Sequence, residues 1–415
     1  LGVCHAAGIV VTPQGGNTGL VSGGVPRGGI VLATERLTRI REVDVDNASM
    51  TVEAGCILSV LQDVAEQHDF LFPLSLASQG SCRIGGNLAT NAGGNHTVRF
   101  GNTRENVLGL EVVLADGRVW NGLRSLRKNN TGYDLKQLFI GSEGTLGVIT
   151  AATFRLLPKP ADRETVLVAF DRIAAVSALY QRLRSRLSER ILAYELMPEL
   201  GLQLAEAHVP GARSPFDRSH PWYALIDLST SDRAGALSGE LEALLSTALE
   251  DGLVTDVVAA HSAPQAAGLW KLREAIPEAQ ARAAAVIKHD VAVPLSAMTR
   301  FLEDGMALLQ SLAPSARVLP FGHLGDGNIH FNLLQPDPDP AARTAFLQRT
   351  AEIQRAMHEL TCSLGGTFSA EHGVGLSKTA DMAHFLDPVE LALMQSLKTA
   401  LDPHSIMNPG KVLPR

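Results

Sequence analysis

The sequence predicts an α+β protein made of two large regions and a C-terminal helical segment. Glycine-rich segments and short β runs fill the first 157 residues, whereas strand-like runs alternate with long helical patterns from about residue 163 onward. We therefore expect one domain at 1–157, a second at 158–385, and a helical segment at 386–415 that returns to the first domain.

The first region carries short β runs at 30–32, 50–52, 110–114 and 147–150. Asp116-Gly117 separates two apolar runs, a pattern that is typical of a β-hairpin turn. The chain opens with Leu1–Gly8, which reads as the end of a helix capped by glycine. From this we expect that the first domain is N-terminally incomplete in this chain.

The second region has the alternating rhythm of strands and helices. A strand–turn–strand unit is predicted at 318–334, a helix from about 340 to 364, and a C-terminal helix at 388–401. The strand–helix pairs that precede them are 165–170 with 173–187, 222–228 with 233–249, and 253–259 with 265–284.

Composition and charge exclude two classes of partner. Hydrophobic residues make up 45% and charged residues 19% of the 415 positions, as in ordinary globular proteins. The net charge of −7 argues against nucleic acid, whose phosphates require a basic face. No apolar run approaches the roughly 18 residues of a membrane span, so we expect no integral membrane protein. Four scattered cysteines without a CxxC pair favour a reduced, cytoplasmic location.

Three glycine-rich segments lie within the first 150 residues, at 13–24, 80–94 and 141–150. Glycine lets the backbone approach a ligand, and successive N–H groups can then bind an anion. The first segment matches neither the dinucleotide fingerprint nor the Walker loop, and alone it could equally be a surface loop. Three such segments with Ser, Thr and Asn side chains favour a nucleotide-type cofactor bound along the backbone.

A candidate metal site lies in the second region. His323 and His330 flank a Gly-Asp-Gly-Asn turn that can place two imidazoles side by side, and Glu371-His372 follows later in the chain. Imidazole and carboxylate groups suit zinc, and three protein ligands leave a coordination position open for catalysis. Asp326 is the weaker ligand candidate, because aspartates in turns usually cap their own backbone.

Arg273 and Lys288 are basic residues of the second region. Arg273 lies in a helical pattern, where a surface charge is the ordinary interpretation without further context. An arginine and a lysine together suit an anionic ligand. Asn332 lies two residues past His330 and therefore points to the same face of its strand.

The three glycine-rich segments resemble the FAD-binding domain of the vanillyl-alcohol-oxidase superfamily, and nearly the whole chain resembles its FAD-linked D-2-hydroxyacid dehydrogenases. The resemblance implies a PCMH-type FAD-binding domain and a ferredoxin-like α+β substrate domain. Segment 13–24 resembles the pyrophosphate loop, and 129–135 and 141–150 resemble flavin-contacting segments. Asn17 stands where some members carry a flavin-bound histidine, which implies non-covalent FAD.

The resemblance also implies the residues that contact the cofactor. The expected FAD contacts are Pro13, Gln14, Gly15, Gly16, Asn17, Thr18, Gly19, Gly80, Ser81, Gly85, Gly86, Asn87, Thr90, Asn91, Gly93, Gly94, Gly144, Gly147, Val148, Ile149 and Asn408.

By the same resemblance, His323, His330 and Glu371 hold Zn²⁺ or another divalent metal, and His372 is the general base. The substrate residues are then Arg273, Lys288, Asn332 and His372. The implied reaction oxidises a D-2-hydroxy acid, foremost D-2-hydroxyglutarate to 2-oxoglutarate, by hydride transfer to FAD N5. The implied electron acceptor is an electron-transfer flavoprotein, a quinone or a cytochrome.

One departure from the family keeps alternatives open. Pro277 stands where the hydroxyglutarate enzymes carry a threonine, and proline cannot donate a hydrogen bond to a distal carboxylate. A D-lactate or glycolate dehydrogenase subunit and a non-catalytic FAD-binding subunit are the alternative functions. Retention of His323, His330, Glu371 and His372 counts against the non-catalytic subunit. The sequence does not fix the oligomeric state, and a homodimer is one option.

Overall fold

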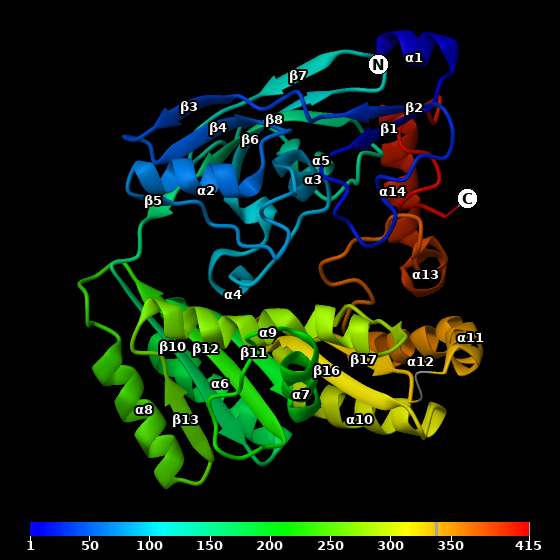
Figure 1. Cartoon of the computed structure of the whole chain (residues 1–415). Helices are drawn as coiled ribbons and strands as arrows, with labels where there is room; N and C mark the ends of the chain where they lie inside the picture. Colours follow the sequence, from blue (N-terminus) through cyan, green and yellow to red (C-terminus); the bar gives the residue numbers. More distant parts are fainter. Residues whose placement is uncertain (337–338, 415) are drawn as a thin grey trace. The chain divides into compact units, whose positions relative to one another are not determined.

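The computed structural model describes residues 1–336 and 339–414, and their contacts form two compact units. Unit 1 holds Leu1–His96, Phe100–Lys159 and the segment that begins at Glu371, whereas unit 2 holds Thr97–Arg99 and Pro160–Ala370. Both units mix helices with sheets, which confirms the α+β prediction (Figure 1). The chain returns to unit 1 at Glu371, earlier than the expected position 386.

A five-stranded antiparallel sheet with strand order β3-β4-β8-β6-β7 forms the centre of unit 1. Helices α2 and α3 cover one face with residues such as Leu61 and Leu88. The opposite face is polar, and there the Thr51 and Thr153 hydroxyls lie 3.0 Å apart across β4 and β8. The hairpin predicted at Asp116-Gly117 is confirmed between β6 and β7. These elements are β3 (Ile40–Asp44), β4 (Ser49–Glu53), α2 (Leu58–Gln67), α3 (Ile84–Ala89), β6 (Val107–Val113), β7 (Val119–Gly122) and β8 (Val148–Arg155).

A second, two-stranded parallel sheet joins the start of unit 1 to its end. β1 pairs with β2, and Val11 of β1 also bridges Met407 near the C-terminus. The predicted first helix and its Gly8 cap, with a φ of 63°, are confirmed. The remaining elements of unit 1 are α1 (Gly2–Ala7), β1 (Val11–Gln14), β2 (Ile30–Ala33), β5 (Phe70–Leu71), η1 (Thr103–Asn106), α5 (Lys136–Phe139), β9 (Leu157–Pro158), α13 (Thr379–Phe385) and α14 (Pro388–Leu401). The first three residues of α4 (Thr97–Phe100) belong to unit 2.

Unit 2 is built on an eight-stranded sheet with the order β13-β10-β12-β11-β16-β17-β14, in which β15 also pairs with β17. Helices α7 and α9 cover one face, and helices α6, α10 and α12 pack on the other (Figure 1). Because helices cover both faces of the sheet, every residue of the central strand β11 is buried. Arg99 of α4 joins this unit by donating to the Ser229 carbonyl oxygen over 2.8 Å.

The predicted strand–helix rhythm of unit 2 is confirmed, except that the helix expected at 340–364 is two helices, α11 and α12. None of the described helices is both long and apolar enough to span a membrane. The elements are β10 (Asp162–Phe170), α6 (Ile173–Leu187), η2 (Ser188–Arg190), β11 (Ile191–Pro198), α7 (Glu199–His208), β12 (Trp222–Thr230), α8 (Ser238–Glu250), β13 (Asp256–Ala259), α9 (Ala263–Ala283), β14 (Val286–Ile287), β15 (Val291–Ala292), η3 (Leu295–Ala297), α10 (Met298–Leu312), β16 (Arg317–His323), η4 (Leu324–Asp326), β17 (Asn328–Leu334), α11 (Pro340–Gln348) and α12 (Thr350–Ser363).

Candidate active site

Glycine-rich loops line an open cavity in unit 1. All three glycine-rich segments contribute to its walls. The predicted cofactor residues that line it are Pro13, Gln14, Gly15, Gly16, Asn17, Thr18, Gly19, Gly85, Gly86, Asn87, Thr90, Gly144, Gly147, Val148 and Ile149.

Close packing of backbone against backbone shapes this cavity. A Cβ atom at Gly16 would lie 2.4 Å from the carbonyl oxygen of Ser81, so only glycine fits there. Asn17 adopts a φ of 53°, a left-handed conformation that asparagine tolerates better than most residues. The first two glycine-rich segments therefore lie directly against each other.

The cavity walls fit a nucleotide cofactor such as FAD. The side-chain oxygen of Asn87 is buried and has no hydrogen-bond partner among the described residues. Because buried polar atoms are normally hydrogen-bonded, this oxygen indicates a ligand that donates to it. A Cβ atom at Gly19 or Gly86 would meet nothing within 4 Å, so the backbone at both positions is open to a ligand.

Six predicted cofactor residues lie outside the cavity lining, and segment 129–135 lies outside it as well. The Asn408 amide instead donates to the carbonyl oxygens of Gly23 (3.1 Å) and Glu143 (2.8 Å), and so holds two cavity loops together. Contact of the predicted residues with FAD remains a prediction. The six are Gly80, Ser81, Asn91, Gly93, Gly94 and Asn408.

Several lining residues were not predicted as individual contacts. Glu143 sits inside a recognised glycine-rich segment, which was the one signal for it, whereas Thr34 lies in no such segment. The additional lining residues are Val21, Gly23, Gly24, Thr34, Cys82, Arg83, Ala89, Ser142, Glu143 and His372.

Glu143 fastens the segment that follows His372 to this cavity. Its carboxylate accepts the backbone N–H groups of Val374 (2.7 Å) and Gly375 (2.8 Å), and the residue is buried. Burial raises the pKa of Glu143, against the opposing effect of these two hydrogen bonds. A Cβ atom at Gly373 would lie 2.7 Å from a Glu143 oxygen, which explains the glycine after His372. This clasp keeps His372 in the cavity wall.

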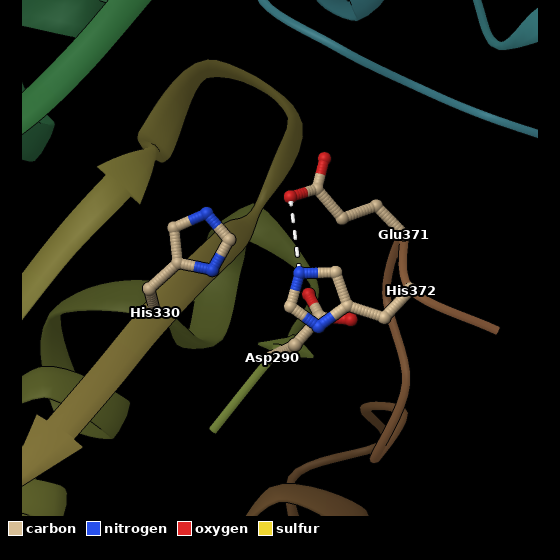
Figure 2. A group of neighbouring side chains, drawn as sticks. All are labelled: Asp290, His330, Glu371 and His372. Carbon is tan, nitrogen blue, oxygen red and sulfur yellow. Dashed lines mark ion pairs between the residues drawn. The ribbon is translucent and has the colours of Figure 1, made fainter. Parts of the chain in front are cut away.

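Four potential metal ligands gather where the chain leaves Ala370. One ligand atom each from Asp290, His330, Glu371 and His372 lies within 4.8 Å of the other three. Figure 2 shows His330 on its strand and His372 with Glu371 on the segment that follows Ala370. The Ala370 N–H donates to the Asp290 carbonyl oxygen over 3.2 Å, so Glu371 begins one residue from that contact. Two imidazoles and two carboxylates fit a divalent ion such as Zn²⁺.

This group includes the predicted ligands His330 and Glu371, and it adds Asp290. Sequence reasoning missed Asp290, because its proximity to His330 follows from the pairing of β15 with β17 rather than from any motif. The Asn328 amide donates to the Asp290 carboxylate over 3.0 Å and orients it. Asp326, the weaker candidate, accepts the Asn328 N–H within its own turn.

His323 lies outside the group of four, although its ring centre is 5.7 Å from that of His330. Nδ1 of His323 is 2.7 Å from Oε1 of Glu195, a β11 residue that is 1% exposed. With Nδ1 as the donor, Nε2 is the nitrogen that can bind a metal. His323 stays a predicted ligand.

The predicted substrate arginine shares the same carboxylate. Arg273 is buried, and its Nε donates to Oε2 of Glu195 over 2.8 Å. Its guanidinium carbon also lies 5.1 Å from the centre of the Phe321 ring. Burial alone would raise the pKa of Glu195, but the charges and hydrogen bonds of His323 and Arg273 lower it to about 2.

The other predicted substrate residues differ in exposure. Asn332 is 2% exposed, and its amide donates to Gln280 of α9 over 2.9 Å while its oxygen accepts the His289 N–H over 3.2 Å. Lys288 has an exposed side chain. Pro277 is exposed within α9, between Arg273 and Gln280.

Comparison with known proteins assigns the family. Residues 1–122 match the family described as FAD binding domain, and residues 159–412 match the C-terminal domain of FAD linked oxidases. A D-2-hydroxyglutarate dehydrogenase of Xanthomonas citri pv. viticola is 39% identical over 98% of this chain and 85% of its own length. The mitochondrial D-2-hydroxyglutarate dehydrogenase of Bos taurus is 41% identical over 99% of this chain and 74% of its own length. Cytoplasmic location of this chain stays a prediction.

Solved structures agree in fold. p-Cresol methylhydroxylase with bound substrate superimposes with a TM-score of 0.73 at 16% identity, over 99% of this chain and 85% of its own. 4-Ethylphenol oxidase from Gulosibacter chungangensis gives 0.72 at 18% identity, over 100% and 87%. These findings confirm the resemblance drawn from the glycine-rich segments, and the chain belongs to the family of FAD-linked oxidases.

Proposed function

We propose that this protein is a flavin- and metal-dependent dehydrogenase that oxidises D-2-hydroxyglutarate to 2-oxoglutarate. The observation that carries this proposal is the double position of His372. It lines the glycine-rich cavity, and it also belongs to the group with Asp290, His330 and Glu371. The residues that would hold FAD and those that would hold the divalent ion therefore share this imidazole, which can act as a base.

The chain's own residues divide the work of substrate binding and proton transfer. His372 would accept the proton of the substrate hydroxyl, a role that suits an imidazole near neutral pH. Arg273 would bind the C1 carboxylate through its Nη atoms, because its Nε is already bound to Glu195. When bound, FAD would accept the C2 hydride at N5, and the divalent ion would lower the pKa of the substrate hydroxyl.

The names of the relatives support hydroxyglutarate as the substrate. Relatives from a bacterium and from cattle share this name at 39% and 41% identity over nearly the whole chain. Lys288 has an exposed side chain and can serve as a cation for the second carboxylate. The electrons would leave to an electron-transfer flavoprotein, a quinone or a cytochrome, as the family resemblance implies.

Pro277 favours a second candidate, oxidation of a shorter hydroxy acid such as D-lactate or glycolate. It lies on α9 between Arg273 and Gln280 and offers no hydrogen-bond donor to a distal carboxylate. The presence of Lys288 argues for the dicarboxylate, so the two residues point to different substrates.

Anaerobic reduction of the flavin tests the proposal. The FAD-loaded protein is mixed with D-2-hydroxyglutarate or with D-lactate, before and after chelation and after zinc is restored. We expect bleaching of the flavin band by hydroxyglutarate that chelation abolishes and zinc restores. Bleaching by lactate alone would transfer the assignment to the second candidate. Bleaching by neither substrate in protein that holds FAD and metal would refute both.

A Lys288→Ala variant tests the dicarboxylate preference. A charged hydrogen bond to the distal carboxylate is worth about 1.5–3 kcal/mol, so KM for hydroxyglutarate should rise by about tenfold or more. KM for D-lactate should not change, because lactate has no second carboxylate. Lys271→Ala removes another exposed lysine nearby in sequence and serves as the control. Equal effects on both substrates would contradict the role of Lys288.

A further inference from the structure

Glu195 is a buried carboxylate that no motif explains. It lies on β11 within the sequence Ile191–Pro198, in which every residue is buried. Its side chain points to the sheet face that α9 covers, as do its alternate neighbours Ala193 and Met197. A buried carboxylate costs free energy unless charged or hydrogen-bonding partners offset that cost. Its partners therefore indicate why it is there.

Both oxygens of Glu195 have a partner with a predicted role in the site. Oε1 faces Nδ1 of His323 at 2.7 Å, and Oε2 accepts Nε of Arg273 at 2.8 Å. His323 is the register partner of Glu195 across β11 and β16, so strand pairing itself places the two side chains together. The arginine comes from α9, the helix above this face. One carboxylate thus joins a predicted metal ligand to a predicted substrate ligand.

These two contacts fix the orientation of both partners. Nδ1 of His323 donates to Glu195, which selects the tautomer whose Nε2 lone pair can bind a metal. Carboxylates that hold ligating histidines in this way tune metal affinity. For Arg273, the bond through Nε and the nearby Phe321 ring, 5.1 Å away, hold the guanidinium plane. The Nη atoms take no part in the bond to Glu195 Oε2 and can bind a carboxylate.

We propose that Glu195 is a positioning residue that couples the metal site to the substrate arginine. By holding His323 and Arg273 at once, it sets both the affinity for the divalent ion and the affinity for the anionic substrate. This inference rests on the proposed function, because that function gives His323 and Arg273 their roles.

The same sheet contains a control residue, a buried carboxylate whose role is purely structural. Asp227 on β12 is fully buried on the same face, accepts hydrogen bonds from Arg163 and Thr165, and also binds α9 through Trp270 Nε1 at 3.2 Å. It is therefore a second buried carboxylate that binds an arginine and α9, although its arginine, Arg163, is exposed. None of its hydrogen-bonding partners is a predicted ligand of metal or substrate.

The experiment compares Glu195→Gln with Asp227→Asn in the FAD-loaded protein. Zinc affinity is measured by competition with a chromophoric chelator. Affinity for 2-oxoglutarate is measured from the change in flavin absorbance of the oxidised, zinc-saturated protein. In Glu195→Gln one amide group must face a donor, so at least one partner loses its acceptor. We expect about 10- to 100-fold weaker zinc binding and weaker binding of 2-oxoglutarate, while Asp227→Asn stays within about threefold of the wild type.

The outcomes separate this inference from the proposed function. Equal effects of the two substitutions on zinc and 2-oxoglutarate would overturn the positioning role. If Glu195→Gln does not fold, Glu195→Asp keeps the charge on a shorter side chain and should show the same coupled loss, with smaller size. Tight zinc binding by a wild type that oxidises no hydroxyglutarate would refute the function alone. A wild type that binds no zinc would refute both.

Discussion

Two buried glutamates, one in each unit, are stabilised in opposite ways. Glu143 in unit 1 accepts hydrogen bonds from two backbone N–H groups, and burial raises its pKa. Glu195 in unit 2 is also buried, but Arg273 and His323 outweigh the effect of burial and lower its pKa to about 2. Two backbone amides thus offset only part of the cost of burying Glu143, whereas Arg273 and His323 together offset more than the cost of burying Glu195.

The difference matters because each glutamate supports a different part of the candidate site. Glu143 holds the backbone of the segment that carries Glu371 and His372, so it fixes the course of the chain. Glu195 holds the side chains of His323 and Arg273, so it fixes their orientation and charge. Substitutions should therefore act through geometry in unit 1 and through electrostatics in unit 2.

The largest effect is expected from Glu195→Ala. Removing the carboxylate leaves Arg273 buried without its ionic partner, and breaking a buried ion pair from one side costs about 3–5 kcal/mol. The free energy of unfolding, measured with urea, should fall by that amount. Glu240→Ala is the control, because its pair with Arg190 is exposed and should contribute less than about 1 kcal/mol. Equal losses of unfolding free energy in Glu195→Ala and Glu240→Ala would show that the buried ion pair stabilises the protein no more than an exposed one.

A smaller loss of stability with a clear loss of turnover is expected from Glu143→Ala. The N–H groups of Val374 and Gly375 lose their acceptor, at a cost of about 1–3 kcal/mol. Because these residues follow His372, we expect kcat to fall by about 10- to 100-fold through misplacement of the base. Glu66→Ala, which breaks the exposed pair with Lys159, should leave kcat unchanged. Unchanged kcat in Glu143→Ala would refute the clasp.

Gly373→Ala tests the same clasp from its other side. Gly373 has a φ of +80°, and an added Cβ atom would lie 2.7 Å from a Glu143 oxygen. The backbone strain alone should cost about 1–3 kcal/mol. In the double variant Glu143→Ala/Gly373→Ala the steric part disappears, so the loss of unfolding free energy should be smaller than the sum of the single losses. Strict additivity would show that the two residues do not interact.

The sequence predicted the residues that belong to motifs and missed those that depend on tertiary contacts. His330, Glu371 and the glycine-rich loops stand in recognisable local patterns. Asp290 joins the metal group only through the pairing of β15 with β17. Glu195 stands in an apolar strand, where its partners come from β16 and from α9.

The fold shows the same division between local and distant information. Turns and helix ends follow from glycine, Asp-Gly and proline signals, which explains why the hairpin at Asp116-Gly117 and helix α14 were predicted correctly. The return of the chain at Glu371 depends on the bond of Val374 to Glu143, which lies 231 positions away in sequence. No local pattern encodes a contact over that separation.

The pH dependence of stability should give the smallest effect and separates the two glutamates directly. A carboxyl group whose pKa is raised in the folded state stabilises the protein below its ordinary pKa of 4.5, and this contribution is lost as the pH rises through the raised value. Glu195, with its lowered pKa, contributes fully above 4.5 and loses its contribution only as the pH falls through about 2. Between about pH 5 and about pH 8, therefore, only Glu143 of the two adds a slope.

The measurement is the thermal unfolding midpoint of wild type and Glu143→Gln across this pH range. The charges of Lys378 and Lys411 act on Glu143 in the opposite direction to burial, and both lysines remain in the variant. The stability of the wild type relative to the variant should therefore fall as the pH rises. If the difference in unfolding midpoint between wild type and variant stays constant or grows with pH, the two amides and two lysines together offset the effect of burial on the pKa of Glu143. Glu143 and Glu195 would then not be stabilised in opposite ways.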